Sequence, residues 1–115
     1  MKTLLFILLV FGYMVEVAVQ AGDWPTWRGP DGIGLSDEKQ MPLKWSATEN
    51  VVWKVPLDEP GNSSPIVAGG KVFITQAMEN GTKRCLVCFD RKTGRKLWQR
   101  ETKFMGKEPT HKTNP

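Results

Sequence analysis

The sequence is poor in the residue types that most enzyme and metal sites require. Its 115 residues include one histidine, His111, and two cysteines, Cys85 and Cys88. A single histidine excludes a two-histidine metal site or a paired-histidine relay built from this chain alone. His111 lies among threonines and lysines and is interpreted as a loop residue, with a ligand role in a larger assembly as the alternative.

The two cysteines are predicted to be buried and not bonded to each other. Residues 84–89 alternate like a strand, in which residues three apart point to opposite faces and lie roughly 10 Å apart. A disulfide requires Cα atoms within about 7 Å. We therefore interpret Cys85 and Cys88 as small buried apolar residues, with a redox or metal role as the alternative to their C-x-x-C spacing.

The other candidate motifs lack the neighbouring residues or elements that their chemistry requires. The carboxylates at 37–38 and 58–59 are sequence neighbours, which do not form the facing pair that acid–base catalysis needs. The stretch 31–37 lacks the closing glutamate of a calcium loop, and the glycines of 29–34 neither follow a strand nor open a helix. The sequence thus predicts no catalytic, cofactor-binding or metal-ligating residues, and no cofactor.

Basic residues exceed acidic ones, 16 to 12, for a formal net charge of +4. Many of them follow Arg91, with Trp98 and Phe104 among them. A nucleic-acid footprint would look similar. We interpret these residues instead as solvated turns and strand edges, and no nucleic-acid partner is predicted.

The N-terminus has the pattern of a secretory signal peptide, assigned to residues 1–21. Lys2 precedes an apolar run, Leu4 to Val15, that is shorter than the roughly 20 residues of a membrane span. Cleavage is predicted between Ala21 and Gly22; the alternative is an uncleaved anchor. No membrane span is expected after cleavage, and the mature protein is predicted to be periplasmic or secreted.

The pattern turns to β-strands after an irregular segment, residues 22–50. A short strand is predicted at Val51–Val55, ended by Pro56. Four more are predicted at residues 65–68, 71–77, 84–89 and 95–100, joined by turns at Gly69-Gly70, Asn80-Gly81 and Asp90–Gly94. Trp98 follows Trp53 by 45 positions, which is the length of one four-stranded propeller blade.

The predicted fold class is therefore all-β: a four-stranded antiparallel blade plus one extra strand, part of a larger β-propeller. Both faces of the predicted sheet are apolar, so neighbouring blades are expected to cover them. Residues 51–115 are assigned to this first blade region, and its loop-like end, 101–115, is interpreted as a truncated linker to a second blade. The alternative is a complete small β protein of 94 residues.

The run Phe89-Asp90-x-x-Thr93-Gly94-x-x-Leu97-Trp98 resembles the blade signature of the pyrroloquinoline-quinone-type (PQQ-type) β-propellers. The resemblance implies that the Asp and Thr-Gly close the last hairpin and that the Trp docks one blade onto the next. Trp53 would be the equivalent residue of the preceding blade. It also implies seven or eight blades, with the strand at Val51–Val55 completing the last one.

The segment Trp24-Pro25-x-Trp27-Arg28-Gly29-Pro30 resembles the N-terminus of a large exported bacterial branch of this family. Some relatives are quinone-dependent dehydrogenases, and others are scaffolds without a cofactor. We expect a non-catalytic binding or scaffold protein, present as an N-terminal fragment. Its partners would be the remaining blades and an unidentified protein or carbohydrate. The alternative is a fragment of a PQQ-dependent dehydrogenase.

Overall fold

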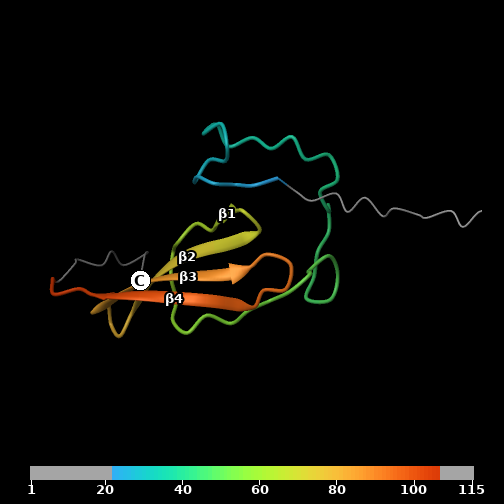
Figure 1. Cartoon of the computed structure of the whole chain (residues 1–115). Helices are drawn as coiled ribbons and strands as arrows, with labels where there is room; N and C mark the ends of the chain where they lie inside the picture. Colours follow the sequence, from blue (N-terminus) through green and yellow to red (C-terminus); the bar gives the residue numbers. More distant parts are fainter. Residues whose placement is uncertain (1–21, 107–115) are drawn as a thin grey trace, which may run out of the picture.

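Four strands form one antiparallel sheet in the computed structural model, which describes residues 22–106. They are β1 (Ile66–Ala68), β2 (Lys71–Met78), β3 (Lys83–Asp90) and β4 (Lys96–Lys103). The strand order β1-β2-β3-β4 means that each strand pairs with its neighbours in sequence (Figure 1). The predicted all-β fold and its four-stranded meander are confirmed.

Turn residues with positive φ set the first two connections. Gly69 and Gly70 have φ values of 55° and 73°, which suit a tight two-residue hairpin between β1 and β2. The β2–β3 connection contains three such residues, Glu79, Asn80 and Gly81. Both turns lie where the sequence predicts them.

β4 is longer than predicted. The sequence indicates a strand ending at Arg100, whereas β4 continues to Lys103. Cys85 pairs with Glu101 and Lys83 with Lys103, and the Phe104 amide donates to Thr82 O at 2.8 Å. Residues 101–103 are polar and carry no hydrophobic pattern that would predict a strand. Their backbone pairing with β3 extends β4.

The predicted strand at Val51–Val55 is not formed among the described residues, and this prediction is corrected. The segment has no assigned strand and Val52 is 87% exposed, although Trp53 and Val55 are half-buried. A strand is stabilised by hydrogen bonds to a paired strand. Within residues 22–106 the segment is anchored by side chains instead, as described below.

One face of the sheet carries the core. Buried side chains from β2 and β3 pack there with partly buried neighbours, among them Val55; the cluster comprises Val55, Val72, Ile74, Met78, Cys85, Val87 and Phe89. Gln76, only 5% exposed, donates through Nε2 to Glu59 O. The segment 55–59 therefore lies over this face, and it accepts the hydrogen bond of the buried Gln76 side-chain amide.

The opposite face is covered at one end only. Phe73, Cys88 and Trp98 are register partners on adjacent strands, and the Phe73 and Trp98 rings lie 6.0 Å apart. Cys88 is fully buried, whereas Leu86, two positions earlier on β3, is 39% exposed. Within the described residues one face is covered, by the chain's own segment 55–59, and cover by neighbouring blades stays a prediction.

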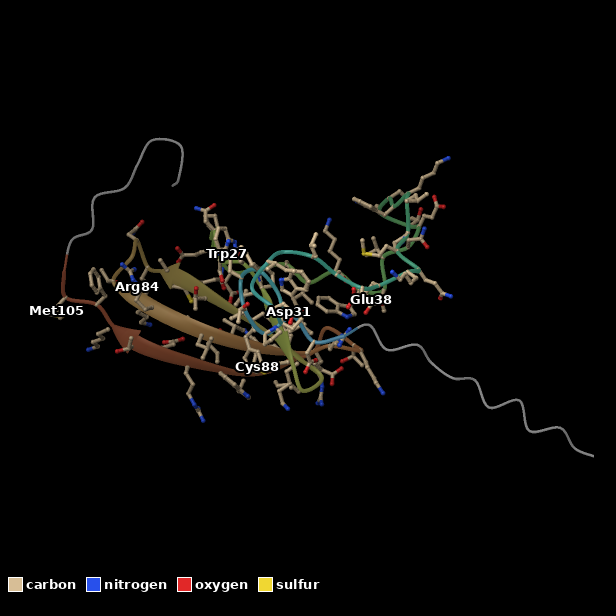
Figure 2. All side chains as sticks on the ribbon, turned by 90° about the horizontal axis from the view of Figure 1, so that it is seen from above. Trp27, Asp31, Glu38, Arg84, Cys88 and Met105 are labelled. Atoms are coloured by element: carbon tan, nitrogen blue, oxygen red, sulfur yellow. The ribbon has the colours of Figure 1, made fainter. Side chains whose placement is uncertain are left out.

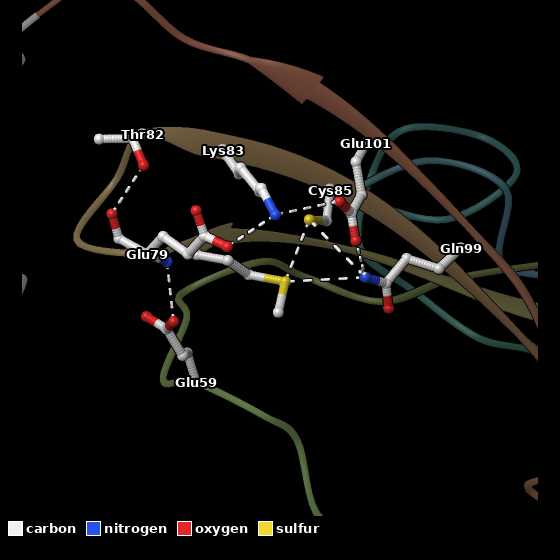
Figure 3. A network of polar contacts seen from close by, with 8 residues as sticks. Glu59, Glu79, Thr82, Lys83, Cys85, Gln99 and Glu101 are labelled. Atoms are coloured by element: carbon white, nitrogen blue, oxygen red, sulfur yellow. Dashed lines mark hydrogen bonds and ion pairs between the residues drawn. The ribbon is translucent and has the colours of Figure 1, made fainter.

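A polar network joins the β2–β3 loop to β4 (Figure 3). Lys83 Nζ lies 2.6 Å from Glu79 Oε1 and 3.6 Å from Glu101 Oε2. The hydrogen bond and charge of Glu79 raise the pKa of Lys83 above its ordinary value. Gln99 Nε2 donates to Glu101 Oε1 at 2.6 Å, so the Glu101 carboxylate is engaged on both oxygens.

Both cysteines are free and buried, as predicted; Cys88 is labelled in Figure 2. Burial, aided by the charge of Glu101, raises the pKa of the Cys85 thiol, so little thiolate is present.

We expect neither thiol to react with Ellman's reagent in the native protein and both to react in denaturant, measured by absorbance. Rapid native labelling, or fewer than two thiols in denaturant, would contradict this account.

Candidate docking site

The β3–β4 turn, residues 90–95, is closed by a local hydrogen-bond network. The Thr93 amide and hydroxyl both donate to Asp90 Oδ1, at 2.8 and 2.7 Å. The Gly94 amide donates to Asp90 O at 2.9 Å, and the Asp90 amide donates to Arg95 O at 2.8 Å. Asp90 therefore organises the turn with both its side chain and its backbone.

The charge of Asp90 is stabilised by this turn. The Thr93 hydroxyl, followed by the Thr93 amide, holds the pKa of the Asp90 carboxyl below its ordinary value. Hydrogen bonds to the charged form of a carboxyl favour that form. The turn is thus most stable when Asp90 is ionised.

The Trp53 indole docks on this turn. Its Nε1 donates to Arg91 O at 2.8 Å, 38 positions away in sequence. Its ring lies against Gly94, where an added Cβ would be 2.6 Å from Trp53 Cδ2. Gly94 is buried and has φ of +71°, a left-handed conformation that glycine adopts without strain. This position requires glycine for both its backbone conformation and the space it leaves for the indole.

The signature residues fall into two groups. Asp90, Thr93 and Gly94 form the turn on which Trp53 docks. Leu97 lies on β4 beside the register shift between Cys88 and Phe89, which accounts for the changed pairing at that end of the strand, and Trp98 packs with Phe73. Trp53 and Trp98, equivalent by sequence spacing, thus have different surroundings.

The N-terminal segment contains a second indole–glycine contact. Trp24 pairs with Val67 through two backbone hydrogen bonds, of 2.7 and 2.9 Å, and extends the sheet beyond β1. An added Cβ on Gly29 would be 2.8 Å from the Trp24 ring. Trp24 is thus packed within the N-terminal segment, whereas Trp27 is 73% exposed.

Asp23 makes long-range structural contacts that the sequence does not predict. Its Oδ2 accepts from the Gly69 amide at 3.0 Å, and its Oδ1 lies 3.7 Å from Arg91 NH1. The Arg91 amide also donates to Gly70 O at 3.1 Å. Asp23 thereby links the N-terminal segment to two hairpin turns at the same end of the sheet. No local motif marks a contact across 46 positions.

Replacing Thr93 with valine tests the role of the hydroxyl. Because the folded-state pKa of Asp90 is lowered, its carboxylate stabilises the fold above an ordinary pKa of about 4, and this contribution is lost as pH falls through the folded-state pKa. Thr93→Val should raise the Asp90 pKa toward its ordinary value, measured by NMR titration of the carboxyl carbon. Thr82→Val, which removes a hydroxyl from the β2–β3 loop, serves as the matched control. An unchanged Asp90 pKa in Thr93→Val would refute the assignment.

The other candidate motifs remain outside this site. The stretches 31–37 and 58–59 lie in loops, and His111 lies outside the described residues. Residues 22–106 hold no cluster of three or more histidine, cysteine or carboxylate side chains suited to a metal ion. In the same range there is no helix that could span a bilayer. Ala21 and the linker beyond 106 also fall outside the described part, whereas Gly22 is described.

Comparison with known proteins assigns the family. One family model, described as outer membrane protein assembly factor BamB, matches residues 36–111, about two thirds of the chain. No curated protein and no solved structure matches. The match includes Trp53, the β3–β4 turn and all four strands. The sheet, its signature turn and this match together show that the chain belongs to the PQQ-like β-propeller repeat family.

Proposed function

We propose that this chain is a structural module of an exported, non-catalytic β-propeller that serves as a binding scaffold. The observation that carries the proposal is the docking of Trp53 on the β3–β4 turn. An indole from outside the sheet is fixed to the blade by one hydrogen bond and by contact with a buried glycine. Such a contact joins a blade to the segment before it, which is what a ring of blades requires.

Two further observations support a ring. Val51–Val55 is held on the blade by Trp53 and Val55 while Val52 is exposed, which leaves a side chain of this segment open to a neighbouring blade. Leu86 leaves part of one sheet face open, where the next blade would pack. The remaining blades are therefore the first partners proposed, with an unidentified protein or carbohydrate as the external partner. The family description, an assembly factor, supports a scaffold role.

Export is proposed from residues 1–21 and is supported by the position of Gly22. The Gly22 backbone nitrogen lies 2.6 Å from Glu38 Oε1. Cleavage between Ala21 and Gly22 would convert this amide into an ammonium group, which pairs more strongly with a carboxylate than a neutral amide does. Processing at this bond would thus strengthen a contact that the structure already contains.

The export proposal is tested by expressing the chain from Met1 in a bacterial host and measuring the intact mass of the periplasmic protein. The expected N-terminus is Gly22. Protein that retains residues 1–21 and stays in the membrane fraction would contradict it. Glu38→Gln is expected to leave the cleavage position unchanged, because it alters a contact of the mature protein only.

The scaffold role is tested against the dehydrogenase alternative by adding PQQ and calcium to the protein. We expect dye reduction in the presence of alcohol or sugar substrates to equal that of heat-unfolded protein. We also expect no saturable quenching of tryptophan fluorescence by the quinone. Saturable, quinone-dependent dye reduction would overturn the proposed function in favour of a dehydrogenase.

A further inference from the structure

The excess positive charge of the chain lies in one segment, Asp90–Lys103. It comprises the β3–β4 turn and strand β4, the outer half of the β3–β4 hairpin, and is here called the outer hairpin. It contains two acidic residues, Asp90 and Glu101. It contains six basic residues: Arg91, Lys92, Arg95, Lys96, Arg100 and Lys103. Its formal net charge of +4 equals that of the whole chain. The rest of the sequence is therefore balanced, and any long-range attraction for an anionic partner centres on this hairpin.

The carboxylates of the outer hairpin are engaged by its own residues and its neighbours. Asp90 accepts two hydrogen bonds from Thr93, and Glu101 is contacted by Lys83 and Gln99. Neither carboxylate forms an ion pair with another residue of the hairpin, although the charge of Arg95 contributes to the lowered pKa of Asp90.

Four basic residues of the outer hairpin form no ion pair with a carboxylate of the described residues. Arg91 forms an ion pair with Asp23, and Lys96 Nζ lies 3.7 Å from Asp58 Oδ2. The others are exposed and form no ion pair with any residue in 22–106; they are Lys92, Arg95, Arg100 and Lys103. The hairpin thus presents unneutralised positive charge to solvent.

The outer hairpin also presents an open strand edge. β4 is the last strand of the sheet, and Figure 1 shows it at the margin. The Phe104 amide donates to Thr82 O, so alternate residues before it, Thr102 and Arg100, direct their backbone groups to β3. The amides and carbonyls of Gln99, Glu101 and Lys103 then point away from the sheet, without a strand partner among the described residues.

The charges decide which strand can occupy this edge. Antiparallel pairing of two copies about Glu101 would place the two Glu101 residues opposite each other and bring both sets of hairpin cations together. Like charges directly opposite each other destabilise a strand pair, and edge lysines are a common guard against self-pairing. An acidic strand avoids this repulsion when an uncharged residue lies opposite Glu101, and its carboxylates then neutralise Arg100 and Lys103.

We propose that the free edge of β4 binds an acidic, extended segment of a partner protein by strand addition. Backbone hydrogen bonds would supply affinity, and alternating side chains would supply selectivity. Carboxylates of the added strand would lie beside Arg100 on one face and Lys103 on the other. This inference deepens the proposed scaffold role, on which it rests, by giving the chemistry of one partner.

The probe is a fluorescein-labelled, acetylated ten-residue peptide of alternating Val-Val and Glu-Glu pairs, which places glutamates on both faces of an added strand. Fluorescence anisotropy at low salt should show saturable binding to the protein, weakened at least about tenfold by Arg100→Glu/Lys103→Glu. The control Lys39→Glu/Lys44→Glu makes the same charge change on exposed lysines away from the sheet and should weaken binding less than about threefold. Equal losses in the two variants would show nonspecific attraction and overturn the proposal.

Two further measurements distinguish strand addition from other causes. A peptide N-methylated at every residue keeps its charge but has no backbone hydrogen-bond donor on either edge, and should bind at least about tenfold more weakly. Equal binding by this peptide would overturn strand pairing.

Light scattering should show a monomer, whereas a dimer abolished by Arg100→Glu/Lys103→Glu would assign the edge to a second copy instead. Failure here leaves the export and quinone tests of the proposed function unaffected, so the two failures are distinguishable.

Discussion

Replacing Trp53 with alanine is expected to lower the free energy of unfolding by about 2–4 kcal/mol. The change removes the packing of the indole on Gly94 and the hydrogen bond from Nε1 to Arg91 O. Truncation of a packed tryptophan costs about 3–5 kcal/mol when the side chain is fully buried. Trp53 is only half-buried, so we expect a smaller loss than for a fully buried tryptophan. Urea denaturation followed by circular dichroism measures the change.

Trp45→Ala is the matched control for this experiment. Trp45 is 71% exposed, and a surface substitution of this kind is expected to change the free energy of unfolding by less than about 0.5 kcal/mol. Trp53→Phe keeps an aromatic ring but lacks the N–H group, so its loss should be intermediate, since one hydrogen bond contributes about 1 kcal/mol. Equal stability of Trp53→Ala and Trp45→Ala would show that the docking contact does not stabilise the blade.

Replacing Gly94 with alanine is expected to destabilise the protein by about 2–4 kcal/mol. A left-handed conformation costs an L-residue about 1–2 kcal/mol, and the new methyl group would also displace the Trp53 ring. Gly70→Ala is the matched control. Gly70 has nearly the same φ, +73°, and no atom within 4 Å of an added Cβ. It should show only the conformational cost.

A double-mutant cycle separates the two costs at Gly94. Once Trp53 is alanine the displaced ring is gone, so Gly94→Ala in that background should cost about as much as Gly70→Ala. Contacting residues commonly show coupling of about 0.5–3 kcal/mol, whereas independent sites add. Additive losses for Trp53→Ala and Gly94→Ala would mean that the two residues are not in contact.

Local turn chemistry made most of the sheet predictable. Gly69-Gly70 marks a hairpin because both residues have positive φ, and Asp90 with Thr93 marks the β3–β4 turn through side-chain hydrogen bonds that span three residues. Each turn fixes the ends of two strands. The exception is the end of β4, where polar residues after Arg100 are held by pairing with β3 rather than by burial.

Contacts between distant segments were less predictable. The resemblance of the signature implied that a tryptophan docks between blades, and the structure places Trp53 on the turn of Asp90, Thr93 and Gly94. Nothing in the sequence around Asp23 indicates its contacts with Gly69 and Arg91, because a single carboxylate has no periodic pattern. The strand expected at Val51–Val55 failed for a related reason, since a strand depends on a partner that local sequence does not specify.

The contact between Trp53 and Gly94 is tested most directly by NMR spectroscopy. The structure predicts strong nuclear Overhauser effects between the Trp53 indole protons and the Gly94 α-protons. It also predicts that the α-protons are shifted upfield by the ring current, and that the indole N–H exchanges slowly because it is bonded to Arg91 O. Both Gly94 signals should return to ordinary positions in Trp53→Ala. Unshifted Gly94 α-protons and a rapidly exchanging Trp53 indole N–H in the unmodified protein would contradict the docking of Trp53 on this blade.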